Sequence, residues 1–441
     1  MFRRAPSLFV PSRSAPVFAR LALLPLLLLV ACGGGSVPGG STGTGGTLPA
    51  PAPGPVVPTQ NPTPVPTPTP APGPGTDTGR CAFTVTNDVT VPTTAVNTAS
   101  ACDYLIQDTL RVTSLLIIKP GTVLRFTQDS ELVIGPSGVL NAVGTPTARI
   151  RMEGANKTKG YWDGISFNGT RPGRIEYTDI ESAGQAGHYK NYAAVSGVDG
   201  TLSFKNNTVS GSYANGMIIS DLNRLFIKEF ANNVFYGNVG LGVRVSTQQA
   251  TVLDAASDYL GTSKGLPNSL PYMDLDWDDT YNDTTLHKLN APYYVDNAVY
   301  YKGSLLTIEP GVKIVMDSGA AFNLHGGAIR AVGTAADPII FTGEKAERDY
   351  WNGIDFFYSG SSQNRLENVK VLYGGSGKGA NVYVGNGSYL KIQNSVLAHS
   401  SGYGVCLDSI ELGNAVASVD IGPGMSYEDN PGGNVNLNAC E

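Results

Sequence analysis

The sequence is poor in charged residues and in histidine, and it lacks the periodicity of amphipathic helices. Asp, Glu, Lys and Arg make up 15% of the 441 residues, and there are four His. No stretch of ten or more residues repeats apolar side chains every three to four positions, the pattern of a helix on a protein surface. A fold of long helices is therefore excluded, and general-base material for catalysis is scarce.

Beyond residue 32 acidic residues outnumber basic ones. The first 32 residues carry four Arg and no acid, so the formal charge of −6 for the whole chain becomes −10 for the remainder. Nucleic-acid binding needs a basic surface, and we expect no nucleic-acid partner. The five Cys are too few for a disulfide-dense scaffold.

The longest apolar run is too short to cross a membrane. Residues 21–30 are apolar except for Pro25, whereas a spanning helix needs about 20 residues. With the preceding Arg residues, the run predicts an export signal over residues 1–31. It ends in Ala31-Cys32-Gly33, which resembles the lipobox of bacterial lipoproteins. The resemblance implies cleavage after Ala31 and lipid on Cys32, which would anchor the protein to a membrane of the cell envelope. The alternative is ordinary signal-peptide cleavage, with Cys32 incidental.

Residues 32–80 have no hydrophobic periodicity and are dominated by Gly, Pro, Thr and Ser. Such a segment cannot bury enough apolar surface to offset its ordering entropy. We expect a disordered tether whose Pro-rich second half is semi-rigid.

The chain after residue 80 contains a duplication. The phrase Ser114-Leu-Leu-Ile-Ile-Lys-Pro-Gly121 returns as Ser304-Leu-Leu-Thr-Ile-Glu-Pro-Gly311, 190 positions later. Tyr161-Trp-Asp-Gly-Ile165 likewise returns as Tyr350-Trp-Asn-Gly-Ile354. The short apolar runs between Pro-Gly turn signals predict β-strands. We therefore expect two related units of stacked strands, residues 81–250 and 291–441, joined by a segment at 251–290.

A shorter period lies within each unit. Asn206-Asn207-Thr-Val is followed 26 residues later by Asn232-Asn233-Val-Phe, and Asn394-Ser-Val begins a third copy. This rung resembles the repeat of right-handed parallel β-helices, and the longer phrases resemble large bacterial cell-surface β-helix proteins. The resemblance implies an all-β, right-handed parallel β-helix over about residues 100–410. In such a fold a corner Asn tolerates the left-handed conformation and can hydrogen-bond along a ladder of equivalent residues, while Gly supplies the tight bend. One continuous helix and two abutting helices both fit, and an array of β-sandwiches is the structural alternative.

The densest acidic cluster is Asp274–Asp283. Asp274, Asp276 and Asp278 alternate as at the start of a calcium loop, but Asp279 stands where the turn needs Gly and Thr285 where a bidentate Glu belongs. The alternative is a strand with Leu275 facing the core and the carboxylates facing water. We predict no metal and no cofactor.

Carbohydrate cleavage is the enzymatic alternative, because polysaccharide lyases and hydrolases share the resembled fold. The polygalacturonase-type carboxylate and Gly-His-Gly motifs are missing, and the chain offers only scattered carboxylates. These are Asp163, Glu176, Asp179 and Glu367. Asp163 and Asp179 become Asn352 and Lys370 in the second unit, so the duplication retains no carboxylate pair.

We therefore expect a structural, adhesive or binding role rather than catalysis. The partners would be a cell-surface glycan or an envelope protein. The Tyr-Trp pairs at 161–162 and 350–351 could stack on sugars, or could pack the core.

Four cysteines remain besides Cys32. Three pairings are possible, and a bridge needs Cα atoms within ~7 Å. Because a solenoid keeps its ends apart, we predict the disulfides Cys81–Cys102 and Cys406–Cys440. The alternative is four reduced, buried thiols.

Overall fold

The computed structural model describes residues 83–85, 89–90, 93–96, 102–185, 193–219, 225–276, 279–408 and 416–437. The predicted signal segment and tether, with Cys32, Cys81 and Cys440, lie outside this part of the chain. The described residues are almost entirely β, with two short 3-10 helices, η1 (Thr247–Val252) and η2 (Thr262–Lys264). None of the helices in this part is long and apolar enough to cross a membrane.

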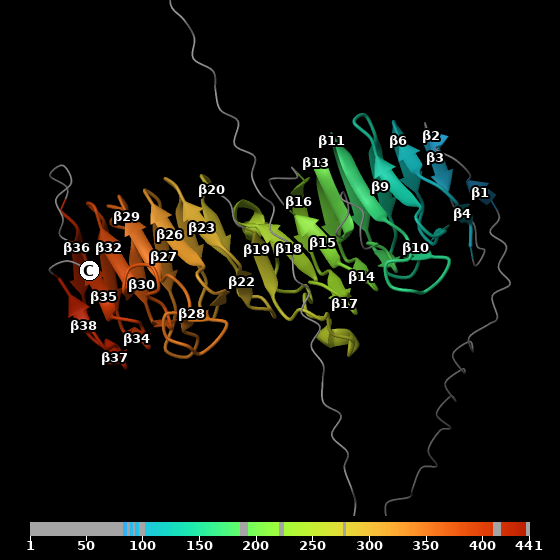
Figure 1. Cartoon of the computed structure of the whole chain (residues 1–441). Helices are drawn as coiled ribbons and strands as arrows, with labels where there is room; N and C mark the ends of the chain where they lie inside the picture. Colours follow the sequence, from blue (N-terminus) through green and yellow to red (C-terminus); the bar gives the residue numbers. More distant parts are fainter. Residues whose placement is uncertain are drawn as a thin grey trace, which may run out of the picture. The chain divides into compact units, whose positions relative to one another are not determined.

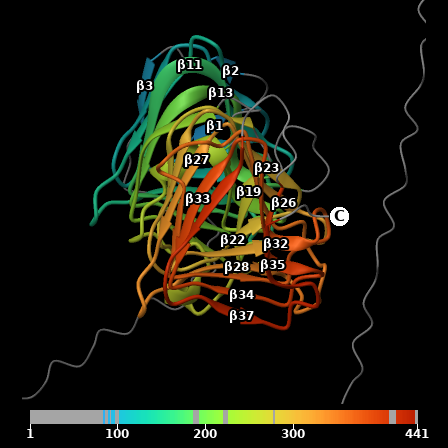
Figure 2. The ribbon, with the colours of Figure 1, turned by 90° about the vertical axis from the view of Figure 1, so that its left-hand side faces the viewer.

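Successive strands form coils that stack on one another, so the chain is a parallel β-solenoid (Figure 1). Each strand pairs in parallel with its counterpart in the next coil, for example β1 (Phe83–Val85) with β4 (Tyr104–Ile106), and β7 (Val123–Phe126) with β10 (Ile150–Gly154). Figure 2 shows the coils turned by 90° from the view of Figure 1. The prediction of an all-β parallel β-helix with a duplicated unit is confirmed.

The described strands fall into four sheets, which we number 1 to 4. Sheet 1 contains β1 (Phe83–Val85), β4 (Tyr104–Ile106), β7 (Val123–Phe126), β10 (Ile150–Gly154), β12 (Thr178–Glu181), β14 (Thr208–Ser210) and β17 (Val234–Tyr236). Sheet 3 contains β20 (Asp279–Thr280), β23 (Ala298–Tyr301), β26 (Ala321–His325), β29 (Ile354–Phe357), β32 (Ala380–Gly385), β35 (Tyr403–Leu407) and β38 (Gly433–Asn436). Sheet 4 contains β21 (Thr284–Leu286), β24 (Leu305–Ile308), β27 (Ala328–Val332), β30 (Arg365–Glu367), β33 (Tyr389–Gln393) and β36 (Ser418–Ile421).

Sheet 2 is larger because two long strands, β11 (Gly164–Glu176) and β13 (Ala193–Lys205), join two faces of the first unit. One face contains β3 (Thr93–Val96), β6 (Leu115–Ile118), β9 (Val139–Val143) and β16 (Leu225–Ala231). The other contains β2 (Val89–Thr90), β5 (Leu110–Val112), β8 (Glu131–Ile134), β15 (Asn215–Ile219), β18 (Val243–Ser246), β19 (Met273–Asp276), β22 (Tyr293–Val295), β25 (Lys313–Met316), β28 (Ile339–Gly343), β31 (Val369–Leu372), β34 (Val396–Ala398) and β37 (Ser426–Glu428).

The duplicated phrase forms a strand followed by a tight turn in both units. In β24, Leu306 and Ile308 point into the core, and in β6 their twins Leu116 and Ile118 do the same. Gly311 then adopts φ +79°, a conformation that glycine takes at no steric cost. Alternation along each short strand thus buries one side, and stacking buries those side chains against the next coil.

Asparagines build the predicted corner ladder. Asn206 and Asn232 have φ values of 57° and 54°, in the left-handed region. The residues that follow are buried, and the backbone N–H of Asn207 donates to Oδ1 of Asn233 at 3.0 Å. The N–H of Asn233 in turn donates to Oγ of Ser257 at 2.8 Å. Each side chain therefore satisfies a corner amide of the preceding coil.

The aromatic pairs serve packing. Trp162 and Trp351 are completely buried, and Trp162 stacks on Phe126 with ring centroids 3.9 Å apart. The indole N–H of Trp351 donates to the backbone carbonyl of Leu372 at 2.8 Å. These Trp rings are core residues and offer no platform to a sugar.

The solenoid changes its sheets between the two units. Sheet 1 ends at β17 within the described residues, whereas sheet 2 continues from β18 through β19 to β22. Sheets 3 and 4 begin at β20 and β21, and η1 packs between β16 and β21. Strand hydrogen bonding is therefore continuous across the changeover in sheet 2, while the other faces are replaced.

Candidate functional site

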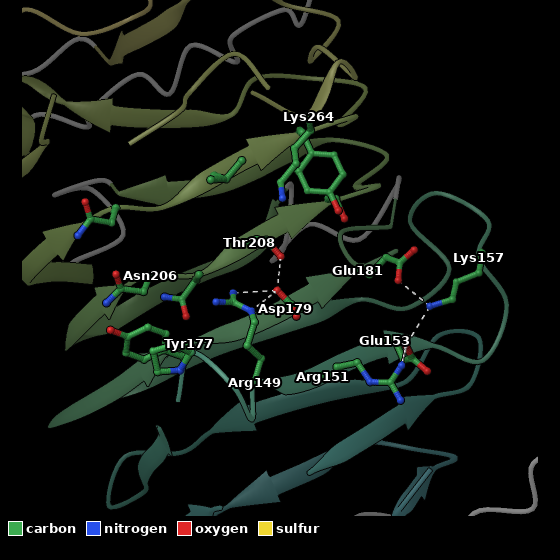
Figure 3. A pocket seen from close by; sticks show the side chains of 16 residues that line it. Arg149, Arg151, Glu153, Lys157, Tyr177, Asp179, Glu181, Asn206, Thr208 and Lys264 are labelled. Carbon is green, nitrogen blue, oxygen red and sulfur yellow. Dashed lines mark hydrogen bonds and ion pairs between the residues drawn. The ribbon is translucent and has the colours of Figure 1, made fainter. Parts of the chain in front are cut away.

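A surface pocket of about 690 Å³ lies on the outer face of sheet 1, across β10, β12, β14 and β17 (Figure 3). Its lining comes from four successive coils and from the loop that carries η2. Because the alternate residues of these strands fill the core, their partners on the outer face are free to carry polar chemistry.

Strand register arranges these outer residues in two rows along the stack. One row contains Arg151, Asp179, Thr208 and Val234. The second contains Glu153, Glu181, Ser210 and Tyr236. Neighbours within a row are about 4.8 Å apart, the spacing of paired strands. Each of the four coils therefore contributes one residue to each row of the pocket.

Glu153 is the centre of an ion-pair network. Arg125 donates to Glu153 at 2.9 Å, and Lys157 bridges Glu153 and Glu181 at 3.0 and 2.6 Å. Arg151 lies 3.8 Å from the same carboxylate. Burial raises the pKa of Glu153, but the hydrogen bonds from Arg125 and Lys157 outweigh this effect and hold the pKa below its usual value. Glu153 is therefore ionised at neutral pH.

A second network surrounds Asp179. The guanidinium of Arg149 lies 2.8 Å from Oδ1 of Asp179, and the hydroxyl of Thr208 donates to the same oxygen at 2.6 Å. Figure 3 shows both contacts beside the Lys157 bridge. At the far end of the pocket, Nζ of Lys264 lies over the ring of Tyr236, 5.9 Å from its centroid. The pocket thus combines ion-paired side chains, hydroxyl groups and an aromatic ring.

The predicted site cysteines are only partly described. Cys102 precedes β4 and Cys406 lies in β35; both are buried and each is disulfide-bonded. Several coils of about 4.8 Å separate the two, so they are not bonded to each other. This excludes one of the three pairings. The pairs Cys81–Cys102 and Cys406–Cys440 stay predictions, because Cys81 and Cys440 lie outside the described residues.

The four candidate carboxylates are not brought together. Asp179 lines the pocket, whereas Asp163 precedes β11 and Glu176 ends that strand, paired with Arg174 at 2.9 Å. Glu367 lies in β30 of the second unit. They form no acid–base pair.

The acidic cluster takes the strand alternative in part. Leu275 is buried in the core, but Asp274 and Asp276 do not face water, because Arg244 of β18 covers them at 3.2 and 2.8 Å. Among the described residues, no group of three or more His, Cys, Asp or Glu is arranged to hold a metal ion. Asp278 lies outside these residues.

Sequence reasoning missed most pocket residues. Arg149, Arg151, Lys157 and Lys264 were not singled out, although a signal was present. Arg149-Ile-Arg-Met-Glu153 alternates polar and apolar residues. Asp179-Ile-Glu181 repeats this alternation 28 residues after Arg151, and Thr208-Val-Ser210 repeats it 29 residues after Asp179. Aligning the polar positions of successive rungs would have located the rows.

Comparison of the chain with models of protein families, with curated proteins and with solved structures found no match. The fold itself defines the class: the chain is a parallel β-solenoid protein.

Proposed function

We propose that this chain is a lipid-anchored protein of the cell envelope that binds an extended glycan in the pocket on sheet 1. The observation that carries the binding role is the pair of outer rows, which offers hydrogen-bonding side chains at a regular spacing along four coils. A linear polysaccharide presents hydroxyls at a comparable repeat. Ligand pockets typically combine a small number of convergent polar groups with an aromatic side chain.

The anchor rests on the sequence. Cys32 follows an apolar run after an Arg-rich leader, and the Gly/Pro-rich segment up to residue 80 provides a tether between lipid and solenoid. Lipid on the thiol and an acyl chain on the new amino terminus would together give stable anchoring.

The chemistry of the pocket favours binding over cleavage. Hydrolysis of a glycosidic bond needs one carboxyl that stays protonated to donate to the leaving group. Glu153, the most buried carboxyl in the pocket, is instead ionised, because hydrogen bonds from Arg125 and Lys157 hold its pKa below the usual value. Asp179 and Glu181 are engaged in ion pairs with Arg149 and Lys157.

The test is retention of the lipidated protein, in detergent micelles, on immobilised envelope glycans and cell-wall fractions. Tyr236→Ala removes the ring at the end of one row and should weaken retention at least about tenfold, or ~1.4 kcal/mol. Tyr281→Ala is the matched control, because Tyr281 is 60% exposed and lies beside sheet 3, away from the pocket. Equal retention of both variants and the unmodified chain would contradict a role for the pocket, and release of shortened sugars would favour the enzymatic alternative.

A further inference from the structure

Carboxylates stack in register at the changeover between the two units. The register of sheet 2 places Arg244 of β18 beside Asp274 of β19, and Asp274 beside Tyr294 of β22. One step further along these strands stands a column of acids on successive coils. It contains Asp276, Asp296, Asp317 and Glu344. We call these four residues and Asp274 the junction carboxylates.

Among the described residues, few cations lie around these acids. Arg244 contacts Asp274 and Asp276 at 3.2 and 2.8 Å. The hydroxyl of Tyr350 lies 3.3 Å from a carboxylate oxygen of both Asp317 and Glu344. Like charges on adjacent strands are destabilising, and they are more so where water is excluded. Asp296 and Glu344 are exposed, and Nζ of Lys345 lies 5.7 Å from the ring centroid of Tyr350 at the Glu344 end of the column. The repulsion is therefore concentrated at buried Asp274 and Asp276, which share Arg244.

Asp274 and Asp276 are the two buried members of the group, 9% and 6% exposed. Oδ1 of Asp274 is buried and has no hydrogen-bond partner among the described residues, whereas its Oδ2 faces Arg244. The rings of Tyr272 and Tyr294 stack beside it with centroids 4.3 Å apart. A buried carboxylate with an unsatisfied oxygen is costly when ionised, and a neutral carboxylic acid costs much less.

We propose that the junction carboxylates form a proton-dependent switch: a proton on Asp274 keeps the β18–β19–β22 pairing closed, and loss of that proton loosens the junction between the two units. The switch acts where it does because sheet 2 carries the strand hydrogen bonds across the changeover. Repulsion between Asp274 and its acidic neighbours therefore weakens the strand pairing that joins the two units.

The groups that face Asp274 account for its titration. Burial raises the pKa of Asp274 to about 7; Arg244 from β18 opposes this shift, while Asp296 beside β22 and Asp276 of its own strand add to it. Burial also raises the pKa of Asp296. Beyond them, Asp317 and Glu344 extend the acidic column, and burial raises the pKa of Tyr272 on the other side.

The direction of the pH effect follows from linkage. The pKa of Asp274 is higher in the folded chain than the ordinary aspartate pKa of 3.8. Its contribution to stability is therefore fully present below about pH 4 and is lost as the pH rises through 7. Between pH 5 and pH 8 the ratio of folded to unfolded chain should fall about 90-fold from this group alone.

The experiment measures urea unfolding of the full chain in detergent micelles between pH 5 and pH 8, with Asp274→Asn as the test variant. Asn carries no charge at any pH and matches the neutral acid in shape. The variant should lose most of the 90-fold pH dependence and should be more stable than the unmodified chain at pH 8. Asp420→Asn is the control, since Asp420 is half exposed beside Lys391 and should leave the pH profile unchanged.

Two outcomes would overturn the proposal. If Asp274→Asn is the less stable protein at pH 8, Asp274 acts as an ionised partner of Arg244 and holds no proton. If both proteins share one pH profile, another group titrates. Should the variant fail to fold, hydrogen exchange of the unmodified chain decides, after correction for intrinsic exchange. Amides of β19 and β22 should lose protection between pH 5 and pH 8 relative to those of β31, and uniform protection refutes the switch.

Discussion

The strongest test of the corner ladder is removal of one Asn side chain from its middle. Asn233 is completely buried; its Oδ1 accepts the N–H of Asn207 at 3.0 Å, and its Nδ2 donates to the carbonyl of Phe204 at 2.9 Å. Asn233→Ala leaves the N–H of Asn207 buried without its acceptor and removes one donor to the Phe204 carbonyl. The unsatisfied N–H costs about 1–3 kcal/mol and the lost donor about 1 kcal/mol, so the free energy of unfolding should fall by about 2–4 kcal/mol.

Serine offers a graded control, because the chain already uses it at an equivalent corner. In the second unit, Oγ of Ser395 accepts the N–H of Val369 at 3.1 Å. Asn233→Ser should therefore keep an acceptor for the amide of Asn207 and lose only the donor to Phe204. We expect it to cost about half as much as Asn233→Ala.

The neighbouring corner residue separates backbone strain from hydrogen bonding. Asn232 is exposed and adopts φ +54°, so Asn232→Ala should cost only the left-handed strain of about 1–2 kcal/mol. Urea unfolding gives the three free energies, and hydrogen exchange at the Asn207 amide reports the ladder locally. If Asn233→Ala costs no more than Asn232→Ala, or if Ser is no better than Ala, the ladder does not hold the coils together.

Two further predictions concern the cysteines. Non-reducing peptide mapping should find Cys102 joined to Cys81 and Cys406 joined to Cys440; in the chain-entropy model each bridge contributes about 3 kcal/mol. A peptide that joins Cys81 to Cys406 would refute the pairing. Cys32→Ser should abolish partitioning into a detergent phase or leave the precursor uncleaved, and unchanged partitioning would contradict the anchor.

The fold could be predicted because every coil must satisfy the same structural constraints. A coil must place apolar residues inward at alternate positions, turn at glycine, and satisfy corner amides. Leu306, Ile308 and Gly311 meet the first two needs, and Asn207 and Asn233 the third. Since each need recurs with the coil, a single sequence contains several copies of the same evidence.

The pocket was harder to predict, because outward side chains need not satisfy the packing rules of the core. Arg151 and Asp179 stand on different strands, 28 residues apart, and the register of β10 with β12 makes them neighbours. Their relation appears in the sequence only when the polar positions of successive rungs are aligned. Trp162 shows the converse case: an aromatic residue at a conspicuous repeated phrase fits either a binding role or core packing, and its burial against Phe126 decides for packing.

The changeover was the hardest feature to foresee, because the duplicated units do not occupy equivalent faces. β7 lies in sheet 1, but its sequence twin β25 lies in sheet 2; β8 lies in sheet 2, and its twin β26 in sheet 3. The second unit has thus advanced by one face relative to the first. The advance places β19 on β18, and it brings Arg244 of one unit over Asp274 and Asp276 of the connecting strand. Pairs of this kind are absent from the repeat itself, since neither unit alone contains the partner. Charged residues that the sequence pattern predicts to be solvent-exposed can therefore become buried where two copies of a repeat meet out of phase. At such a junction a solenoid can bring together side chains that are not neighbours within either copy.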